Sequence, residues 1–311
     1  MSLYHKYRPK TFVDVMGNEP LIHLLEEATA EKNKEKPHAI LFTGPTGCGK
    51  TTLARIVANE LGAVGNDYRE VDSADFRGID SIREIRKQSG YKALEGKVRV
   101  WLLDECHKLS PDAMHALLKA LEDTPSHVYY ILATTEPQKL LPTIRGRCMV
   151  CPTSLLSDGE MMKLLRRVVK AESESIPKDL YFKIIERGQG HPRNALQLLD
   201  TVLSVSTDQR AVILQKMEEV ELDAIELCRA LIKRASWKTV SGLLVKLKKE
   251  EPESVRRMIL AYCTTILLKE ENNVAGAIMG EMIEPFYNTG FPGLVFACFS
   301  IVCAIVCAPV E

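Results

Sequence analysis

The hydrophobic residues in the first half of the chain form short runs that alternate with stretches of helical spacing. The apolar runs have the length of buried strands and lie at residues 38–42, 68–71, 98–103 and 128–133. The intervening helical stretches are residues 51–61, 79–88 and 111–123. Strands that alternate with helices predict a parallel sheet covered by helices, so the expected fold class is α/β.

The pattern changes after Pro152, where only helical signals remain. Ser157 and Glu160 have the spacing of a capping box, and Pro177 and Pro192 each mark the start of another helix. The sequence therefore predicts an α/β domain followed by a small helical domain and a second helical domain. The expected boundaries are 1–155, 156–207 and 208–311.

Composition indicates a folded protein without a uniform charge. Hydrophobic residues make up 46% and charged residues 26%, which excludes disorder as the main state. Lys+Arg and Asp+Glu both number 41, which excludes a uniformly basic nucleic-acid coat but allows a local basic face. Nine cysteines and the absence of a secretory signal predict reduced thiols and a cytoplasmic location.

One uncharged segment, Phe291 to Val310, raises the question of a membrane anchor. Pro292 and Gly293 interrupt its start and leave an apolar helix of about 14 residues, or roughly 21 Å. A bilayer core is about 30 Å thick. We therefore predict a buried terminal helix and no membrane partner, with a membrane anchor as the alternative.

The strongest motif is GPTGCGKT, which matches GxxxxGK[ST] in full between a predicted strand and a predicted helix. Its glycines allow backbone N–H groups to approach phosphate oxygens at a helix N-terminus. Lys50 is placed to contact the β- and γ-phosphates, and the Thr51 hydroxyl to bind Mg²⁺. The motif predicts an ATP site formed by Gly44, Pro45, Thr46, Gly47, Cys48, Gly49, Lys50, Thr51 and Thr52.

The run at 98–103 ends in the carboxylate pair Asp104 and Glu105. Adjacent strand residues point to opposite sides, so each carboxylate can have its own role. Asp104 is predicted to belong to the Mg²⁺ shell, and Glu105 to orient or deprotonate the attacking water. Without the phosphate loop upstream, such a pair would be an ordinary solvated strand end.

Three further residues are weaker candidates. Thr135 follows the run at 128–133 and could sense the γ-phosphate, while Arg147 and Arg193 could stabilise phosphate charge. On local sequence alone, an ordinary turn threonine and a surface arginine explain Thr135 and Arg147 better, and a surface arginine explains Arg193 equally well. Cys148 and Cys151 form a single CxxC without a second Cys or His pair, so no metal site is predicted there.

Basic residues gather at 76–87, where helical spacing places Arg83 and Lys87 on one face. Such a face can contact a phosphate backbone. The interleaved Asp80 and Glu84 leave a solvated helix face as the alternative.

Together these segments resemble the AAA+ clamp-loader ATPases, a family that includes the gamma/tau subunits of bacterial DNA polymerase III and the small subunits of replication factor C. The resemblance covers about residues 4–200 in order. It rests on KYRPKTF with VMG, the phosphate loop, LLDECHKLSPDAMHALLKALEDTP, ILATTEPQKLLPTIRGRC and GQGHPRNALQLLD. The last hundred residues match only in being helical.

The resemblance implies a role for each candidate. Residues near the adenine or its phosphates would be Tyr7, Arg8, Pro9 and Met16. Thr135 corresponds to the family's sensor 1 residue and Arg193 to the sensor 2 arginine of the lid. Arg147 corresponds to the arginine finger that acts on ATP bound by the next subunit. The implied catalytic set is Lys50, Asp104, Glu105, Thr135, Arg147 and Arg193.

The resemblance also implies partners. The expected assembly is a pentamer of clamp-loader subunits held together by the helical collar at 208–311, with residues 156–207 as a three-helix lid. Arg77, Arg83 and Lys119 would face primer–template DNA, and the segment 88–94 would touch a ring-shaped sliding clamp. ATP binding would open and hold the clamp, and DNA would trigger hydrolysis and release.

Several features depart from the family pattern. Gly146 replaces the serine of its Ser-Arg-Cys motif, and Cys106 with His107 replaces the common Ala-Asp after the two carboxylates. Residues 62–72 lack the cysteines of the zinc module that cellular gamma/tau subunits carry. With no long C-terminal extension expected, the length suits a virus-encoded or replication-factor-C-like subunit.

Two other functions remain open. A DNA-remodelling AAA+ motor, such as a branch-migration ATPase, would form hexamers and usually carry a winged-helix domain. A nucleotide-binding scaffold subunit would show no turnover, although such subunits usually lack an intact phosphate loop or the glutamate that Glu105 provides.

Overall fold

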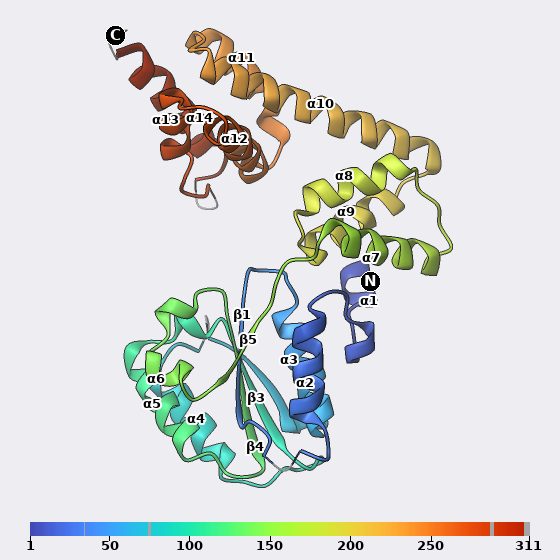
Figure 1. Ribbon diagram of the computed structural model, residues 1–311, viewed down its shortest axis with the longest axis vertical. Coiled ribbons are helices and arrows are strands. Elements are labelled where there is room, and N and C mark those ends of the chain that lie inside the picture. The colour runs from blue at the N-terminus through green and yellow to red at the C-terminus, as the bar shows by residue number, and fades with distance from the viewer. Residues whose placement is uncertain (34, 74–75, 287–288, 308–311) are drawn as a thin grey trace. The chain divides into compact units, whose positions relative to one another are not determined.

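The computed structural model describes residues 1–33, 35–73, 76–286 and 289–307. The chain divides into two compact units, Met1–Ser206 and Thr207–Glu311. The first unit contains the sheet and its helices together with three further helices, and the second is built from helices (Figure 1).

A five-stranded parallel sheet forms the centre of the first unit, in the order β2-β3-β4-β1-β5. The strands are β1 (Ala39–Thr43), β2 (Tyr68–Asp72), β3 (Arg99–Asp104), β4 (Val128–Thr134) and β5 (Met149–Pro152). Thr43 lies opposite Thr134, and Leu103 opposite Leu132. The carboxyl ends of β1, β3 and β4 therefore lie at one edge of the sheet, as in the α/β fold predicted from the sequence.

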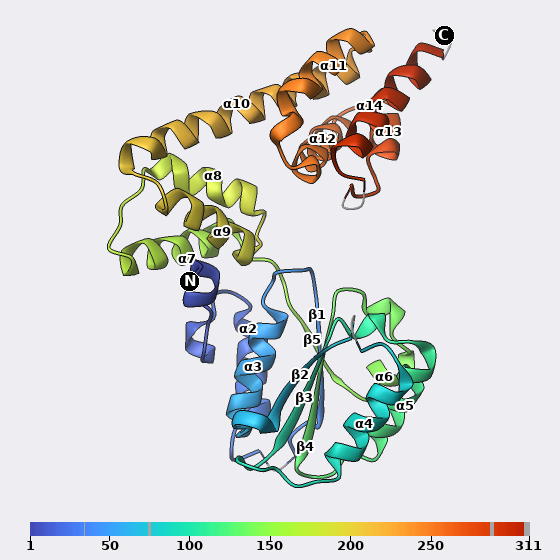
Figure 2. The same ribbon diagram turned by 180° about the vertical axis from the view of Figure 1, so that it is seen from behind.

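Helices cover both faces of the sheet, which explains why the inner strands β1, β3 and β4 are nearly continuous apolar runs. The helices α2 (Glu19–Thr29) and α3 (Lys50–Leu61) lie on one face. On the other face lie α4 (Ile79–Ser89), α5 (Pro111–Glu122) and the short α6 (Pro142–Arg145), as both views show (Figures 1 and 2). Alternate residues of β3 enter the two cores: Val100 and Leu102 on one side, Trp101 and Leu103 on the other.

Short elements complete the connections of this unit. They are α1 (Leu3–Lys6), η1 (Phe12–Asp14), η2 (Gly65–Asp67), η3 (Cys106–Lys108) and η4 (Pro137–Lys139). Ser110 caps α5, because its hydroxyl accepts a hydrogen bond from the N–H of Ala113, with Pro111 at the first helical position.

Three helices, α7 (Asp158–Ala171), α8 (Lys178–Gly188) and α9 (Pro192–Leu203), follow the sheet. The capping box is confirmed, because Ser157 and Glu160 exchange side-chain and backbone hydrogen bonds at the start of α7. α9 packs against α1, and the N–H of Leu3 donates to Asp200 at 3.4 Å. The N-terminus of the chain is thereby attached to this three-helix group.

The second unit consists of helices in its described part. They are α10 (Thr207–Ile232), α11 (Trp237–Lys246), η5 (Leu247–Lys249), α12 (Pro252–Leu267), α13 (Asn273–Glu281) and α14 (Gly290–Cys307). Leu231, Leu244, Ile259, Ile278 and Ile301 meet in one core to which five helices contribute. A single shared core explains why this unit folds compactly.

The terminal apolar segment forms α14, but it begins earlier than predicted. The helix starts at Gly290 and contains Pro292 in its first turn, so the expected start after Gly293 is wrong. Proline is tolerated there because first-turn N–H groups have no partner within the helix. Residues 308–310 of the predicted segment lie outside the described residues. None of the helices searched within the described residues is long and apolar enough to cross a bilayer.

A buried carboxylate organises the loop before β3. Asp67 is fully buried and accepts hydrogen bonds from the N–H groups of Leu94, Glu95 and Gly96, each at 2.7 Å. The buried guanidinium of Arg99 lies 3.7 Å away. Burial alone raises the pKa of Asp67, but the three N–H groups and Arg99 lower it overall. The side chain therefore contributes to folding as an anion.

Replacing Asp67 is expected to destabilise the fold. Asp67→Ala should lower the free energy of unfolding by about 3–5 kcal/mol, because three N–H groups and Arg99 lose their acceptor. The contribution is fully present above the unfolded pKa of about 3.9 and is lost as the pH falls toward the folded pKa. Urea unfolding at pH 7 and at several pH values below about 3.9 measures both effects.

The matched control is Asp80→Ala. Asp80 is exposed and pairs with the exposed Arg83 at 3.1 Å, so the expected change is within about 0.5 kcal/mol. Equal destabilisation by the two substitutions would contradict the role given to the buried carboxylate.

Candidate nucleotide-binding site

The phosphate loop connects the end of β1 to the start of α3, where its glycines permit an unusual backbone. Gly44, Gly47 and Gly49 have φ values of +146°, +75° and +103°. A Cβ atom at Gly44 would lie 2.3 Å from the carbonyl oxygen of Thr153. The loop can therefore take this shape only with glycine at that position.

Lys50 is buried inside this loop. Its Nζ atom donates hydrogen bonds to the carbonyl oxygens of Gly44 at 2.9 Å and Pro45 at 2.8 Å. The Cys48 thiol donates to the same Pro45 carbonyl at 2.9 Å. The positive charge thus lies within the loop that the sequence assigns to phosphate groups.

Thr51 and Asp104 come together at the edge of the sheet. The Thr51 hydroxyl donates to Oδ2 of Asp104 at 2.7 Å, and both residues line the same cavity. Hydroxyl and carboxylate oxygens are the ligands that Mg²⁺ prefers. The residues present therefore fit the predicted metal.

Glu105 lies next to this pair in a left-handed backbone conformation, with φ of 49°. Its N–H donates to Oδ1 of Asp104 at 2.9 Å, and its side chain also lines the cavity. The Thr135 hydroxyl donates to Oε2 of Glu105 at 3.4 Å, although Thr135 is not a lining residue. The structure thus brings both predicted carboxylates and the predicted sensor residue together.

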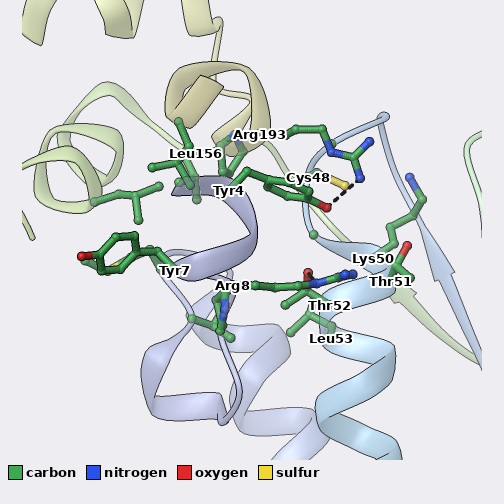
Figure 3. Close-up of a pocket in the computed structure, with 18 of the residues that line it drawn as sticks. Tyr4, Tyr7, Arg8, Cys48, Lys50, Thr51, Thr52, Leu53, Leu156 and Arg193 are labelled. Carbon is green, nitrogen blue, oxygen red and sulfur yellow. Dashed lines mark hydrogen bonds between the residues drawn. The ribbon is translucent and has the colours of Figure 1, made fainter. Parts of the chain in front are cut away.

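The cavity above the loop has a volume of about 310 Å³, which lies at the lower end of the range for small-molecule sites. Its walls come from the phosphate loop, the N-terminal segment and the helices α7 and α9 (Figure 3). The predicted residues that line it are Tyr7, Arg8, Pro9, Met16, Thr46, Gly47, Cys48, Gly49, Lys50, Thr51, Thr52, Asp104, Glu105 and Arg193. Gly44 and Pro45 instead form the base of the loop.

Arg193 reaches the cavity from the first turn of α9. Its Nη2 atom donates to the Tyr4 hydroxyl at 2.9 Å, and the guanidinium lies 4.8 Å from the centre of the Tyr4 ring (Figure 3). Its Nε atom is buried and, within the described part of the chain, has no hydrogen-bond partner. The guanidinium therefore has an unused donor inside the cavity wall.

Sequence reasoning missed Tyr4 and His191. Nδ1 of His191 donates to the carbonyl oxygen of Thr46 at 2.7 Å, so the start of α9 is bonded directly to the phosphate loop. The sequence did offer a signal for His191, because it lies two residues before Arg193, which was already a predicted site residue. Nothing in the local sequence distinguishes Tyr4, which reaches Arg193 only through the packing of α1 against α9.

Ion pairs that the sequence did not indicate attach the N-terminal segment to α7. Asp14 pairs with Arg167 at 3.1 Å, while Glu172 receives hydrogen bonds from the Tyr7 hydroxyl and from Lys6. The hydrogen bond from Lys6, followed by that from Tyr7, lowers the pKa of Glu172. Two walls of the cavity are therefore connected to each other, in part by Tyr7, Asp14 and Arg167, which line it.

Four predicted residues lie away from the cavity. Arg147 is partly exposed and pairs with Glu122 at 2.6 Å. Arg83 and Lys119 are exposed on α4 and α5, two helices that pack together, and Arg77 is exposed just before α4. None of the four is a lining residue of their own chain's site.

The CxxC pair does not resemble a metal centre. Burial raises the pKa of both Cys148 and Cys151 to about 12. Among the described residues, no group of three or more His, Cys, Asp or Glu side chains that could hold a metal ion is present.

The parallel sheet, its phosphate loop and its flanking helices define a fold class: the chain has the AAA+ P-loop fold. In sequence it is similar to the gamma/tau subunits of bacterial DNA polymerase III. It is 36% identical to the gamma/tau subunit of Mycobacterium tuberculosis over 263 residues, covering 74% of this chain and 45% of that protein. It is 35% identical to the tau subunit of Bacillus subtilis over 228 residues, covering 67% and 40%. The chain spans less than half the length of these relatives.

Two family models match parts of the first unit. The model described as DNA polymerase III, delta subunit, matches residues 66–155. The Zeta toxin model matches residues 23–99, which include the phosphate loop.

Among solved structures, the Thermotoga maritima RuvB Holliday junction branch migration motor is similar. Its TM-score is 0.57 at 23% sequence identity, covering 73% of this chain and 79% of that one. A second RuvB structure gives 0.60 at the same identity. At this level of identity the likeness shows the fold alone.

The loop geometry predicts that Gly44→Ala weakens nucleotide binding about 10-fold or more. The Cβ atom would collide with the Thr153 carbonyl, so the loop must move by an amount that costs roughly 1.4 kcal/mol or more. Calorimetric titration with ATP measures the affinity.

The control is Gly159→Ala in the first turn of α7, where a Cβ atom meets open space. Unchanged affinity in both variants would contradict the prediction.

Proposed function

We propose that the chain is an ATPase subunit of a sliding-clamp loader that acts in DNA replication. The observation that carries this proposal is the complete constellation of phosphate loop, Thr51–Asp104 pair and Glu105, in a relative of DNA polymerase III gamma/tau subunits. ATP hydrolysis, and not only ATP binding, needs each of these three parts. The names of the similar proteins support a DNA polymerase III subunit. Clamp opening and clamp loading are what we propose in addition.

In this proposal ATP occupies the cavity between the phosphate loop and the helices α7 and α9. Lys50 exchanges the Gly44 and Pro45 carbonyls for the β- and γ-phosphates, and loop N–H groups surround the phosphate oxygens. Mg²⁺ held by Thr51 and Asp104 would neutralise charge on those phosphates.

Glu105 orients the attacking water and accepts its proton, while the bond between the γ-phosphorus and the β–γ bridging oxygen breaks. Thr135 holds Glu105 through the hydroxyl that already donates to it. Arg193 supplies positive charge from α9, using donors that now face Tyr4 and the cavity wall.

We place Arg147 at the site of a neighbouring subunit. Its distance from the lining residues and its partly exposed pair with Glu122 support a function outside its own site. An arginine finger stabilises charge on the transferred phosphoryl group. The proposal therefore requires an oligomer. The family resemblance implies a pentamer that is held together by residues 208–311. It also implies that residues 156–207 form the lid.

DNA and the clamp are the proposed partners. Arg83 and Lys119 are exposed on adjacent helices, and Arg77 lies at the start of the same layer. Lysine and arginine on one layer suit a phosphate backbone. The loop that Asp67 holds presents Tyr91 and Leu94 to solvent, with 61% and 70% of their surface exposed, which suits contact with a protein ring.

The fold likeness to RuvB keeps a DNA-remodelling motor as the second candidate. The described part of the second unit contains helices, whereas the winged-helix domain expected of such a motor would add strands. A scaffold subunit without turnover is less well supported, because Lys50, Asp104 and Glu105 are all present in the cavity wall.

The test is steady-state ATP hydrolysis by the complex that copurifies with the full chain. It is measured without DNA, with primer–template DNA, and with DNA plus the cognate ring clamp, alongside a complex carrying Lys50→Ala. Stimulation that requires both DNA and clamp, and is lost with Lys50→Ala, supports the proposal. Turnover indifferent to the clamp, or stimulated best by branched DNA, favours the motor. Activity unaltered by Lys50→Ala favours the scaffold.

Arg147→Ala is expected to leave ATP affinity unchanged and to lower DNA-stimulated turnover by about 10³-fold or more, which is typical of a lost arginine finger. The control is Arg55→Ala, because Arg55 also pairs with a glutamate, Glu70, at 2.6 Å and is similarly exposed. Filter binding and phosphate release measure the two quantities. A parallel loss of ATP binding and turnover would argue against the finger role.

A further inference from the structure

His107 lies between two carboxylates beside the site and belongs to no part of the mechanism above. It is the central residue of η3, directly after β3, and only 7% of its side chain is exposed. A buried imidazole needs partners for its two ring nitrogens. The structure supplies them from the ends of both β3 and β4.

One ring nitrogen faces Glu105. Nδ1 lies 3.4 Å from Oε2 of Glu105 and 3.0 Å from the hydroxyl oxygen of Thr134, the last residue of β4. The same Oε2 atom receives the hydroxyl of Thr135 at 3.4 Å. His107 and Thr135 thus approach the same oxygen of Glu105, a residue that also lines the cavity.

The other ring nitrogen faces the loop after β4. Nε2 lies 3.4 Å from Oε1 of Glu136, whose second oxygen is paired with Lys139 at 2.8 Å. Lys139 lowers the pKa of Glu136 most, and His107 also contributes. Glu136 is additionally fixed because its N–H donates to the Thr134 hydroxyl at 3.0 Å. The imidazole is therefore held from a loop that is itself anchored.

Glu105 needs such support. Its side chain is 28% exposed and its backbone is left-handed, so neither burial nor regular secondary structure fixes the carboxylate. A displacement of about 1 Å at a reacting group can lower a rate about 100-fold. The buried, doubly held ring restricts the carboxylate through the 3.4 Å contact of Nδ1 with Oε2, beside the hydrogen bond between Nδ1 and the Thr134 hydroxyl.

We propose that His107 is a positioning residue that holds Glu105, through Nδ1, in the orientation required to activate water. The inference rests on the proposed function, because it assigns no role to His107 unless Glu105 activates water. The imidazole takes no proton from the water. Glu136 and Lys139 hold the ring, so the loop after β4 is coupled to the reacting carboxylate.

The two ring nitrogens can be tested separately. The amide of asparagine reaches about as far as Nδ1, and that of glutamine about as far as Nε2. His107→Asn should therefore keep most of kcat, whereas His107→Gln should lower kcat by about 10- to 100-fold. ATP affinity and melting temperature should remain unchanged in both variants. Turnover is measured in the full complex with DNA and clamp, and the control is His23→Asn, a largely exposed histidine on α2.

A double substitution separates positioning from a structural effect. In a Glu105→Gln complex, adding His107→Gln should lower kcat no further, because the residue it positions is already lost. A further additive loss would overturn the inference, as would equal turnover in the Asn and Gln variants, or a fall in kcat that follows a fall in melting temperature. Full turnover in the single Glu105→Gln complex would instead overturn the proposed function.

Discussion

The hydrogen bond between Thr51 and Asp104 depends on strands that end at one edge of the sheet. The two residues are 53 positions apart in the chain, and β4 lies between β1, which precedes the loop to Thr51, and β3, which ends at Asp104. Parallel pairing places Thr43 opposite Thr134 and Leu103 opposite Leu132, so the segments that follow β1 and β3 leave the sheet together. The phosphate loop, the carboxylate pair and the network around His107 all rely on this alignment.

Loops provide the chemistry here because the strands cannot. Side chains of β1, β3 and β4 are mostly apolar and buried on both faces against helices, which fixes the strand ends. The buried Arg99 and Tyr130 are hydrogen-bonded to α4. Polar groups appear where each strand stops, and Glu105 and Gly44 adopt backbone conformations that a strand excludes. Rigid strands and special loop geometry are thus two results of the same buried sheet.

The cavity also needs walls from both ends of the first unit. The N-terminal segment and α7–α9 are joined by Asp14–Arg167 and by Glu172 with Lys6 and Tyr7, and α9 contacts the phosphate loop through His191. Movement of α9 would therefore reach the loop through a single hydrogen bond. This arrangement gives bound nucleotide a physical route to the three-helix group.

The sequence by itself determined the α/β class, the positions of four of the five strands, the phosphate loop and the carboxylate pair, because periodicity and fixed spacing are local properties. It also placed the cap at Ser157. It failed at the start of α14, since tolerance of Pro292 depends on helix position rather than on residue type. Only the tertiary structure decided that Tyr4 faces Arg193, that His191 bonds the phosphate loop, and that His107 lies between Glu105 and Glu136. These contacts join residues brought together by packing and strand order, and no local spacing encodes them.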